Sequence, residues 1–180
     1  MRAPRLSPLR AVRKMLGRDE LPEGFTGRLE GDERVLGCAV LTGGGHLVVT
    51  SWGLWVPEAD GPRRVGWHLV SKAAWGNGAV ELIEAVEEPA GNAVLLADRP
   101  VRRLRLAEPG RVPQAIHERV TGSIRSRHHR DLPGGGAWFV QRKVAGRDGV
   151  VLQVRPDPGT DVDAVRQVAA DAAAALGLDR

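Results

Sequence analysis

The stretch HLVVTSWGLW, residues 46–55, decides the fold class of this chain. Its first part is rich in β-branched and apolar residues and predicts a strand over residues 46–51. A second strand is predicted over residues 54–58, only a few residues further on. Short strands that follow one another so closely are typical of antiparallel sheets, because antiparallel neighbours need only a tight connection.

Further strand signals lie on both sides of this stretch, and turns rich in Gly, Asn, Asp and Pro separate them. Together with the first two they make a series of seven short strands, which is typical of a small barrel or sandwich. The other five are predicted at residues 34–42, 64–73, 79–86, 92–97 and 101–106.

The pattern changes to helical periodicity after the seventh strand. Val112, Ile116, Val120 and Ile124 are spaced by four residues, which predicts one apolar helix face over residues 112–126. A glycine-rich break follows. Next come a hairpin with strands at 137–144 and 150–155, and a last helix that begins at Thr160 and ends near Gly177.

Seven strands followed by one amphipathic helix is the element order of the pleckstrin-homology-like (PH-like) superfold, a bent barrel capped by a helix. Residues 34–128 fit that order. Residues 46–55 resemble a strand pair of its bacterial members, and residues 64–70, RVGWHLV, resemble their following strand. The whole chain resembles an uncharacterised family of actinobacterial proteins. The resemblance implies a fold and no particular activity, because a succession of strands is not a catalytic signature.

The sequence therefore predicts an α+β protein with three parts. Residues 1–33 are expected to form a basic N-terminal helix and a polar link. Residues 34–130 are expected to form a small antiparallel PH-like barrel of about seven strands, capped by a helix. Residues 131–180 are expected to form a β-hairpin with the C-terminal helix packed on it.

Charge is strongly segregated along the chain, although the net charge is only +4. Residues 1–18 carry six basic and no acidic residues, whereas residues 19–98 carry five basic and 13 acidic residues. Residues 99–130 carry nine basic and two acidic residues. Ordinary soluble surfaces intersperse the two signs, so we predict that the block 99–130 is the main anion-contacting surface.

Arginine suits a phosphate group, because its planar guanidinium can donate two hydrogen bonds at once. Two interpretations of the block stay open. It binds an external polyanion, or it pairs internally with the acidic residues of 19–98. The candidate anion-binding residues are Arg99, Arg103, Arg105, Arg119, Arg125, Arg127 and Arg130.

No arrangement in the sequence points to catalysis, so we nominate no catalytic, cofactor-binding or metal-binding residue. The sequence contains no Gly-x-Ser-x-Gly elbow. The glycine triplets at 43–45 and 134–136 are interpreted as turns, because no Gly-Lys-Ser/Thr follows either. His128 and His129 are interpreted as a polar helix end rather than as zinc ligands, because neighbours on a helix point about 100° apart.

Two other residue types were weighed for function. Cys38 is the single cysteine, which excludes a disulfide framework, and we expect it to be buried. The chain has five tryptophans and no tyrosine, so tryptophan must supply bulk to the core. We expect Trp67 and Trp138 to be core residues.

These observations favour a non-catalytic binding or scaffold protein with no cofactor, whose partner is a protein or an anionic surface. The alternative is a nucleic-acid-binding protein that uses the block 99–130. The Arg-rich, Lys-poor composition indicates a high-GC bacterial genome. No apolar run approaches the ~20 residues that span a membrane, so a cytoplasmic location is expected. The basic residues 1–18 suit peripheral contact with anionic lipid.

Overall fold

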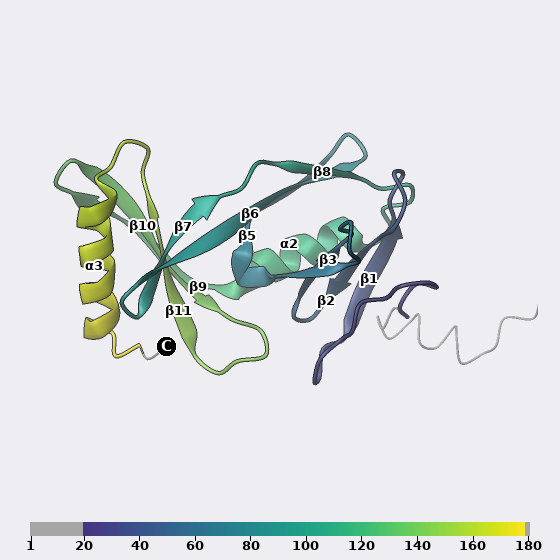
Figure 1. The fold of residues 1–180 in the computed structure, drawn as a ribbon, viewed down its shortest axis with the longest axis horizontal. Helices are drawn as coiled ribbons and strands as arrows, with labels where there is room; N and C mark the ends of the chain where they lie inside the picture. Colours follow the sequence, from purple (N-terminus) through teal and green to yellow (C-terminus); the bar gives the residue numbers. More distant parts are fainter. Residues whose placement is uncertain (1–19, 179–180) are drawn as a thin grey trace, which may run out of the picture.

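Figure 1 shows the computed structural model of the protein, which describes residues 20–178. Short apolar runs, separated by glycine-containing turns, form two sheets. The first sheet is an antiparallel meander, in which each strand pairs with the next along the chain. Its four strands are β1 (Val35–Val40), β2 (His46–Thr50), β3 (Gly53–Val56) and β4 (Arg63–Gly66).

The second sheet is mixed and has the strand order β5-β6-β7-β11-β10-β9, with β8 paired to β6. Its single parallel pairing joins β7 to β11. Its strands are β5 (Val70–Gly76), β6 (Ala79–Ala90), β7 (Ala93–Asp98), β8 (Arg102–Arg105), β9 (Ile124–Leu132), β10 (Gly135–Lys143) and β11 (Val150–Pro156).

The chain passes from the first sheet to the second through a single 3₁₀ turn, η1 (Trp67–Leu69). This turn divides the strand that we expected over residues 64–73 into β4 and β5. The long strand β6 then runs through both halves of the molecule. It pairs with β5 and β8 along its first part and with β7 along its last part.

The first core lies where the curled sheets form a half-barrel around α2 (Val112–Ser123). Val112 and Ile116 of this helix are buried against apolar residues of both sheets. Pro113 lies in the first helical turn, where its missing N–H costs nothing. The predicted four-residue spacing is confirmed as far as Val120, whereas Ile124 already belongs to β9.

The second core lies between α3 (Val162–Ala175) and one face of β7, β10 and β11. Small residues such as Ala169 and Ala173 let the helix approach the sheet closely. The Asp161 side chain caps the helix by accepting hydrogen bonds from the N–H groups of residues 163 and 164, so Asp161 rather than Thr160 is the N-cap. Gly177 ends it with φ +63°, as a terminating glycine does.

The segment 20–33 packs on the outer face of the first sheet and is not the polar link that we expected. Phe25 and Leu29 contact a small cluster around Val48 and Trp55. The side chain of Glu33 is fully buried beneath it. Residues 1–18, predicted as a basic helix that contacts lipid, lie outside the described residues.

The α+β class is confirmed, and the hairpin of β10 and β11 lies where the sequence predicts it. The expectation of one antiparallel barrel is corrected, because the strands divide into two sheets and β7 and β11 are parallel. The predicted helix over 112–126 is three residues shorter, because Ile124 begins a strand that pairs with β10. Within residues 20–178, no helix is both long enough and apolar enough to cross a membrane.

Candidate anion-binding site

A hollow of about 530 Å³ lies between the end of α2, the start of β9 and the 144–149 loop that joins β10 to β11. This volume is within the range of ligand sites in proteins. Ser51 of the β2–β3 turn and Trp67 of η1 complete the walls. We call it the basic hollow after four exposed cationic residues that line it, which are Arg119, Arg125, Lys143 and Arg147.

Local structure accounts for the position of the first two cations. Arg119 lies in the C-terminal half of α2, and the chain enters β9 directly at Ile124. The pairing of β9 with β10 shifts at this point, because Gln141 is opposite Ser126 whereas Arg142 is opposite Ile124. Arg125 is therefore the extra residue of a bulge. Bulges re-aim side chains at the ends of sheets, and this one places Arg125 on the wall of the hollow.

The loop that supplies the other cations is held against the first sheet. Gly146 has φ +76°, and a Cβ atom there would lie 2.9 Å from the Trp52 ring. Only glycine allows the loop to approach the tryptophan so closely in this conformation. The contact between Gly146 and Trp52 holds the loop against the first sheet. Lys143, just before the loop, and Arg147, within it, line the hollow together with residues of α2.

The hollow has an excess of positive charge. Four cationic side chains line it against two acidic ones, Glu118 and Asp148. Within residues 20–178, none of the four cations takes part in an ion pair. The C-terminal end of α2 adds a negative partial charge of only about one half. The site therefore keeps positive potential that an anion can neutralise.

The structure divides the seven candidate residues among separate places. Arg119 and Arg125 share the basic hollow, and Arg127 lines the neighbouring hollow described below. Arg103 and Arg105 are exposed on β8, on either side of buried Leu104.

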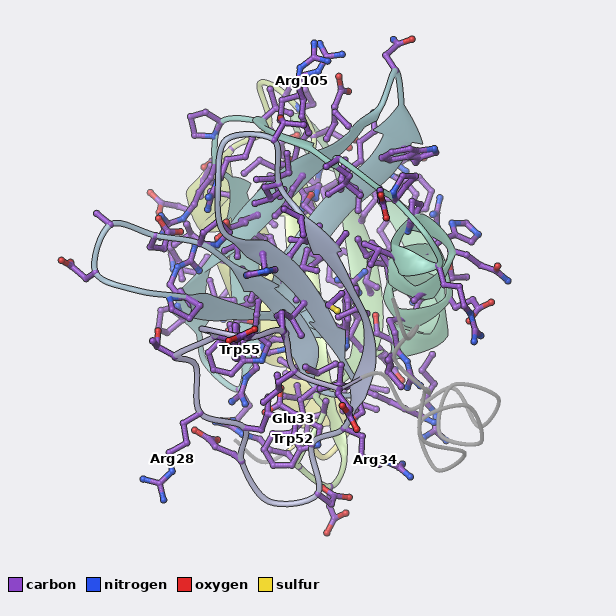
Figure 2. The ribbon with its side chains drawn as sticks, turned by 90° about the vertical axis from the view of Figure 1, so that its right-hand side faces the viewer. Arg28, Glu33, Arg34, Trp52, Trp55 and Arg105 are labelled. Atoms are coloured by element: carbon purple, nitrogen blue, oxygen red, sulfur yellow. The ribbon has the colours of Figure 1, made fainter. Side chains whose placement is uncertain are left out.

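The remaining candidates lie away from the basic hollow. Arg99 lies in the link between β7 and β8 and so does not continue the face of Arg103 and Arg105. Arg130 lies 5.7 Å from the ring of Phe139. Figure 2 shows that Arg105 lies at the end of the molecule opposite Trp52, whose ring contacts the loop of the basic hollow.

Sequence reasoning missed Lys143 and Arg147 as site residues. Both lie beyond residue 130, where the basic block ends, in a region of balanced charge. The sequence predicts Lys143 near the end of the strand 137–144 and Arg147 in the following turn, but no sequence signal shows that this loop faces α2. The loop reaches α2 only through the pairing of β10 with β9.

Internal pairing accounts for one residue of the block 99–130. Arg102 donates hydrogen bonds to Glu58 at 2.7 Å and to Glu84 at 3.4 Å. Both acids lie in the acidic half of the chain, so the internal interpretation holds for Arg102. It does not extend to Arg119 or Arg125, for which the structure gives no carboxylate partner within the described residues.

The expectation that His128 and His129 lie at a helix end is wrong, because both lie on strand β9. His129 Nε2 lies 2.7 Å from Asp157 Oδ2, and its Nδ1 lies 3.6 Å from Asp131 Oδ1. In the described part of the chain, no three His, Cys, Asp or Glu side chains gather as a metal site requires.

Cys38 and Trp67 contribute to packing, whereas Trp138 lies outside the core. Cys38 is half-buried on the outer face of β1, beside the segment 20–33. Trp67 is buried in the first core and donates to the carbonyl of Thr50, as a core tryptophan does. The expectation for Trp138 is wrong, because it lies half-exposed on the sheet face opposite α3.

Comparisons with known proteins add no relative. No protein-family model, curated protein or solved structure matches this chain. The functional argument therefore rests on the basic hollow and its surroundings.

Proposed function

We propose that this protein is a non-catalytic binding module that takes a phosphate-bearing partner into the basic hollow. The observation that carries the proposal is the convergence of four exposed cations from three elements, α2, β9 and the hairpin of β10 and β11. Two of them, Arg119 and Arg125, come from the block that the sequence singled out. Cations brought together from distant parts of a chain repel one another unless a ligand neutralises them.

A PH-like unit is part of the proposal. Support for it comes from the half-barrel of β1 to β6 with β8, which α2 closes on its open side. The hollow lies where this unit meets the hairpin of β10 and β11. A partner bound there would contact both the PH-like unit and the hairpin of β10 and β11, which is compatible with a scaffold role.

The polar groups of the hollow favour binding over catalysis. Ser123 Oγ donates to the carbonyl of Val120 at 2.7 Å, and Ser51 Oγ accepts a hydrogen bond from the N–H of Arg34 at 2.9 Å. Neither serine has a histidine beside it among the lining residues. The arrangement supplies charge and hydrogen-bond donors without the nucleophile–base pair that group transfer uses.

A titration with heparin, a base-free polyanion, tests the proposal. The double variant Arg119→Ala/Arg125→Ala removes two charges from the basic hollow. The matched control, Arg103→Ala/Arg105→Ala, removes two charges from β8. We expect the first variant to weaken binding by about 100-fold or more, because charge-assisted hydrogen bonds contribute about 1.5 kcal/mol or more each. The control should change binding by less than about threefold, because screening limits distant charges.

Added salt supplies the second criterion. Wild-type binding should weaken steeply between low and physiological ionic strength, and the hollow variant should have the shallower dependence. Equal losses in the two double variants would show that only net charge matters and would overturn the basic hollow as the site. No heparin binding by the wild type at low salt would overturn the proposal itself.

A further inference from the structure

A second, smaller hollow lies beside the basic hollow on the face of the second sheet that α3 leaves uncovered. Its volume is about 230 Å³. Ligand sites for whole small molecules are usually larger, about 300–1,000 Å³, so this hollow suits one ring of a larger ligand. We call it the tryptophan hollow. Its lining residues include Trp138, Arg127, Val140, Arg142 and Arg155.

Trp138 presents its ring in this hollow rather than in the core. The guanidinium carbon of Arg127 lies 4.6 Å from the centre of the ring, and the ring of His129 lies edge-on at 5.3 Å. Arg127 is exposed, and its guanidinium lies over the Trp138 ring, so the pair presents an arginine group beside the aromatic ring. Bases of unpaired nucleic acid stack on both kinds of surface, aromatic rings and arginine guanidinium planes.

Neighbouring residues of the paired strands β9 and β10 line the two hollows. On β9, Ile124 lines the tryptophan hollow and the next residue, Arg125, lines the basic hollow. On β10, Arg142 lines the tryptophan hollow and the next residue, Lys143, lines the basic hollow. Trp138 lies five residues from Lys143 of the basic hollow along β10, or roughly 17 Å at ~3.4 Å per residue. A ligand that contacts both Trp138 and Lys143 must extend over this distance.

Two of the three arginines in the tryptophan hollow are committed to the fold. Arg142 donates to the carbonyls of residues 67, 68 and 70, and Arg155 pairs with Asp98 at 2.6 Å. Arg127 has no carboxylate partner within the described residues. Arg127 therefore joins Arg119 and Arg125 as a cation available to a phosphate backbone.

We propose that the phosphate-bearing partner is a single-stranded nucleic acid, whose backbone follows Arg119, Arg125 and Arg127 while a base stacks at Trp138. The inference rests on the proposed function and names the partner of the same surface. Positive charge beside a stacking surface is the combination that binds unpaired strands without strong sequence preference. Duplex DNA does not fit this surface, because its bases are already stacked and paired.

Trp138→Leu tests the base contact, with Trp138→Phe as the variant that keeps an aromatic ring. The matched control is Trp75→Leu, at a 43% exposed tryptophan on β5 that lines neither hollow. Each protein is titrated with a labelled single-stranded thymidylate homopolymer, with duplex DNA of equal length, and with heparin. Unfolding curves report whether each variant remains folded.

Trp138→Leu should weaken homopolymer binding by about 5- to 100-fold, the range that stacking on one aromatic contributes. The salt dependence should keep its slope, because no charge is lost. Heparin binding should not change, and Trp138→Phe should restore most of the affinity for the homopolymer. Trp75→Leu should resemble the wild type with every probe.

The outcomes separate this inference from the function on which it rests. If heparin binds and the homopolymer does not, or if Trp138→Leu leaves homopolymer binding unchanged, the nucleic-acid inference is wrong and the anion-binding module stands. Equal losses for heparin and homopolymer in Trp138→Leu would give the ring a purely structural role and would also overturn the inference. Tighter binding of duplex DNA than of the homopolymer would overturn it too. If no probe binds, both proposals fail.

Discussion

Two arginine-rich regions of this molecule use the same side chain in opposite ways. In the first, which we call the charged belt, the arginines of β4 and β8 meet carboxylates at short distances. Arg64 lies 2.6 Å from Glu33, Arg63 lies 2.9 Å from Glu84, and Arg102 lies 2.7 Å from Glu58. In the second, the basic hollow, the arginines have no such partners within residues 20–178. The difference shows that nearby carboxylates, rather than arginine content, decide whether the arginines of a region form ion pairs within the fold or stay available to other groups.

The charged belt is part of the fold because two of its acids, Glu33 and Glu84, are buried. The side chains of Glu33 and Glu84 are 0% and 6% exposed. The Arg64 guanidinium also lies 5.3 Å and 5.6 Å from the rings of Trp52 and Trp55. Buried charges are tolerated when they are paired and hydrogen-bonded, and losing one partner leaves the other uncompensated.

The largest effect is expected from Glu33→Ala. The Glu33 carboxylate accepts hydrogen bonds from Arg64, from Trp55 Nε1 at 3.0 Å and from the Thr50 hydroxyl. The substitution leaves Trp55 Nε1 without its acceptor and removes the buried carboxylate partner of Arg64, so the free energy of unfolding should fall by about 3–5 kcal/mol. Urea denaturation followed by tryptophan fluorescence measures it.

The matched control is Glu30→Ala, which removes the other carboxylate partner of Arg64. The Glu30 side chain is 63% exposed, so its ion pair should contribute about 0–1 kcal/mol. Similar losses for the two variants would show that burial of the carboxylate does not set its contribution.

The second effect contrasts two neighbours on β10, Arg142 and Lys143. Arg142 is 5% exposed and donates to three backbone carbonyls around η1. Burial, with the charge of Arg155, lowers the pKa of Arg142, yet the guanidinium stays charged at neutral pH. Arg142→Ala leaves these carbonyls without their donor and should cost about 2–4 kcal/mol.

Lys143→Ala should change the free energy of unfolding by less than about 0.5 kcal/mol, because the side chain is exposed. It should weaken heparin binding instead, since Lys143 lines the basic hollow. A Lys143→Ala protein that unfolds as easily as Arg142→Ala would place Lys143 with the fold and remove it from the site.

Much of the fold could be predicted from local patterns. Alternation in residues 150–155 and the four-residue spacing that starts at Val112 both gave the correct element type. The failure at β9 has a physical cause. Its sequence, IRSRHHRDL, has no apolar alternation, because it is an edge strand whose side chains are mostly exposed. Pairing with β10 decides its conformation, and local propensity carries no signal of that pairing.

The site was predictable only in part. The charge block includes Arg119 and Arg125, which line the basic hollow, because charge is a property of the sequence alone. It also included Arg102, which pairs with Glu58 and Glu84 in the charged belt. Separating these cases requires knowing which strands bring acids within reach. That information lies in the long-range pairing of β6 with β8, which no local pattern encodes.

A third prediction concerns the shape of the basic hollow without any change in charge. Gly146→Ala places a Cβ atom 2.9 Å from the Trp52 ring at φ +76°. Gly149→Ala, the control, has φ +88° but no neighbour within 4 Å. Both substitutions should lower the free energy of unfolding by about 1–2 kcal/mol, because a side chain disfavours the left-handed conformation. Only Gly146→Ala should also displace the loop and weaken heparin binding severalfold. Equal heparin affinities would show that loop position does not control the site.

The smallest effect is expected from His68 of η1, which lines a small hollow together with Glu87 and Arg147. Burial lowers the pKa of His68, the charge of Glu87 opposes this, and Arg142 and Arg147 add to the lowering. His68 Nδ1 is buried with no hydrogen-bond partner in the described part of the chain. Protonation would place hydrogens on both ring nitrogens, including this one.

The sign of the pH dependence follows from the direction of this shift. The folded pKa lies below the unfolded value, so the unfolded chain binds a proton first as the pH falls. The contribution of His68 is therefore fully present above about pH 6.5, and it is lost progressively below that value until the folded pKa is reached. The free energy of unfolding, measured by urea denaturation between neutral and mildly acidic pH, should fall more steeply in the wild type than in His68→Gln. His117→Gln, at an exposed histidine of α2, is the matched control for the substitution itself. Parallel curves for the wild type and His68→Gln would mean that the pKa of His68 is the same in the folded and the unfolded chain, and the prediction would then be wrong.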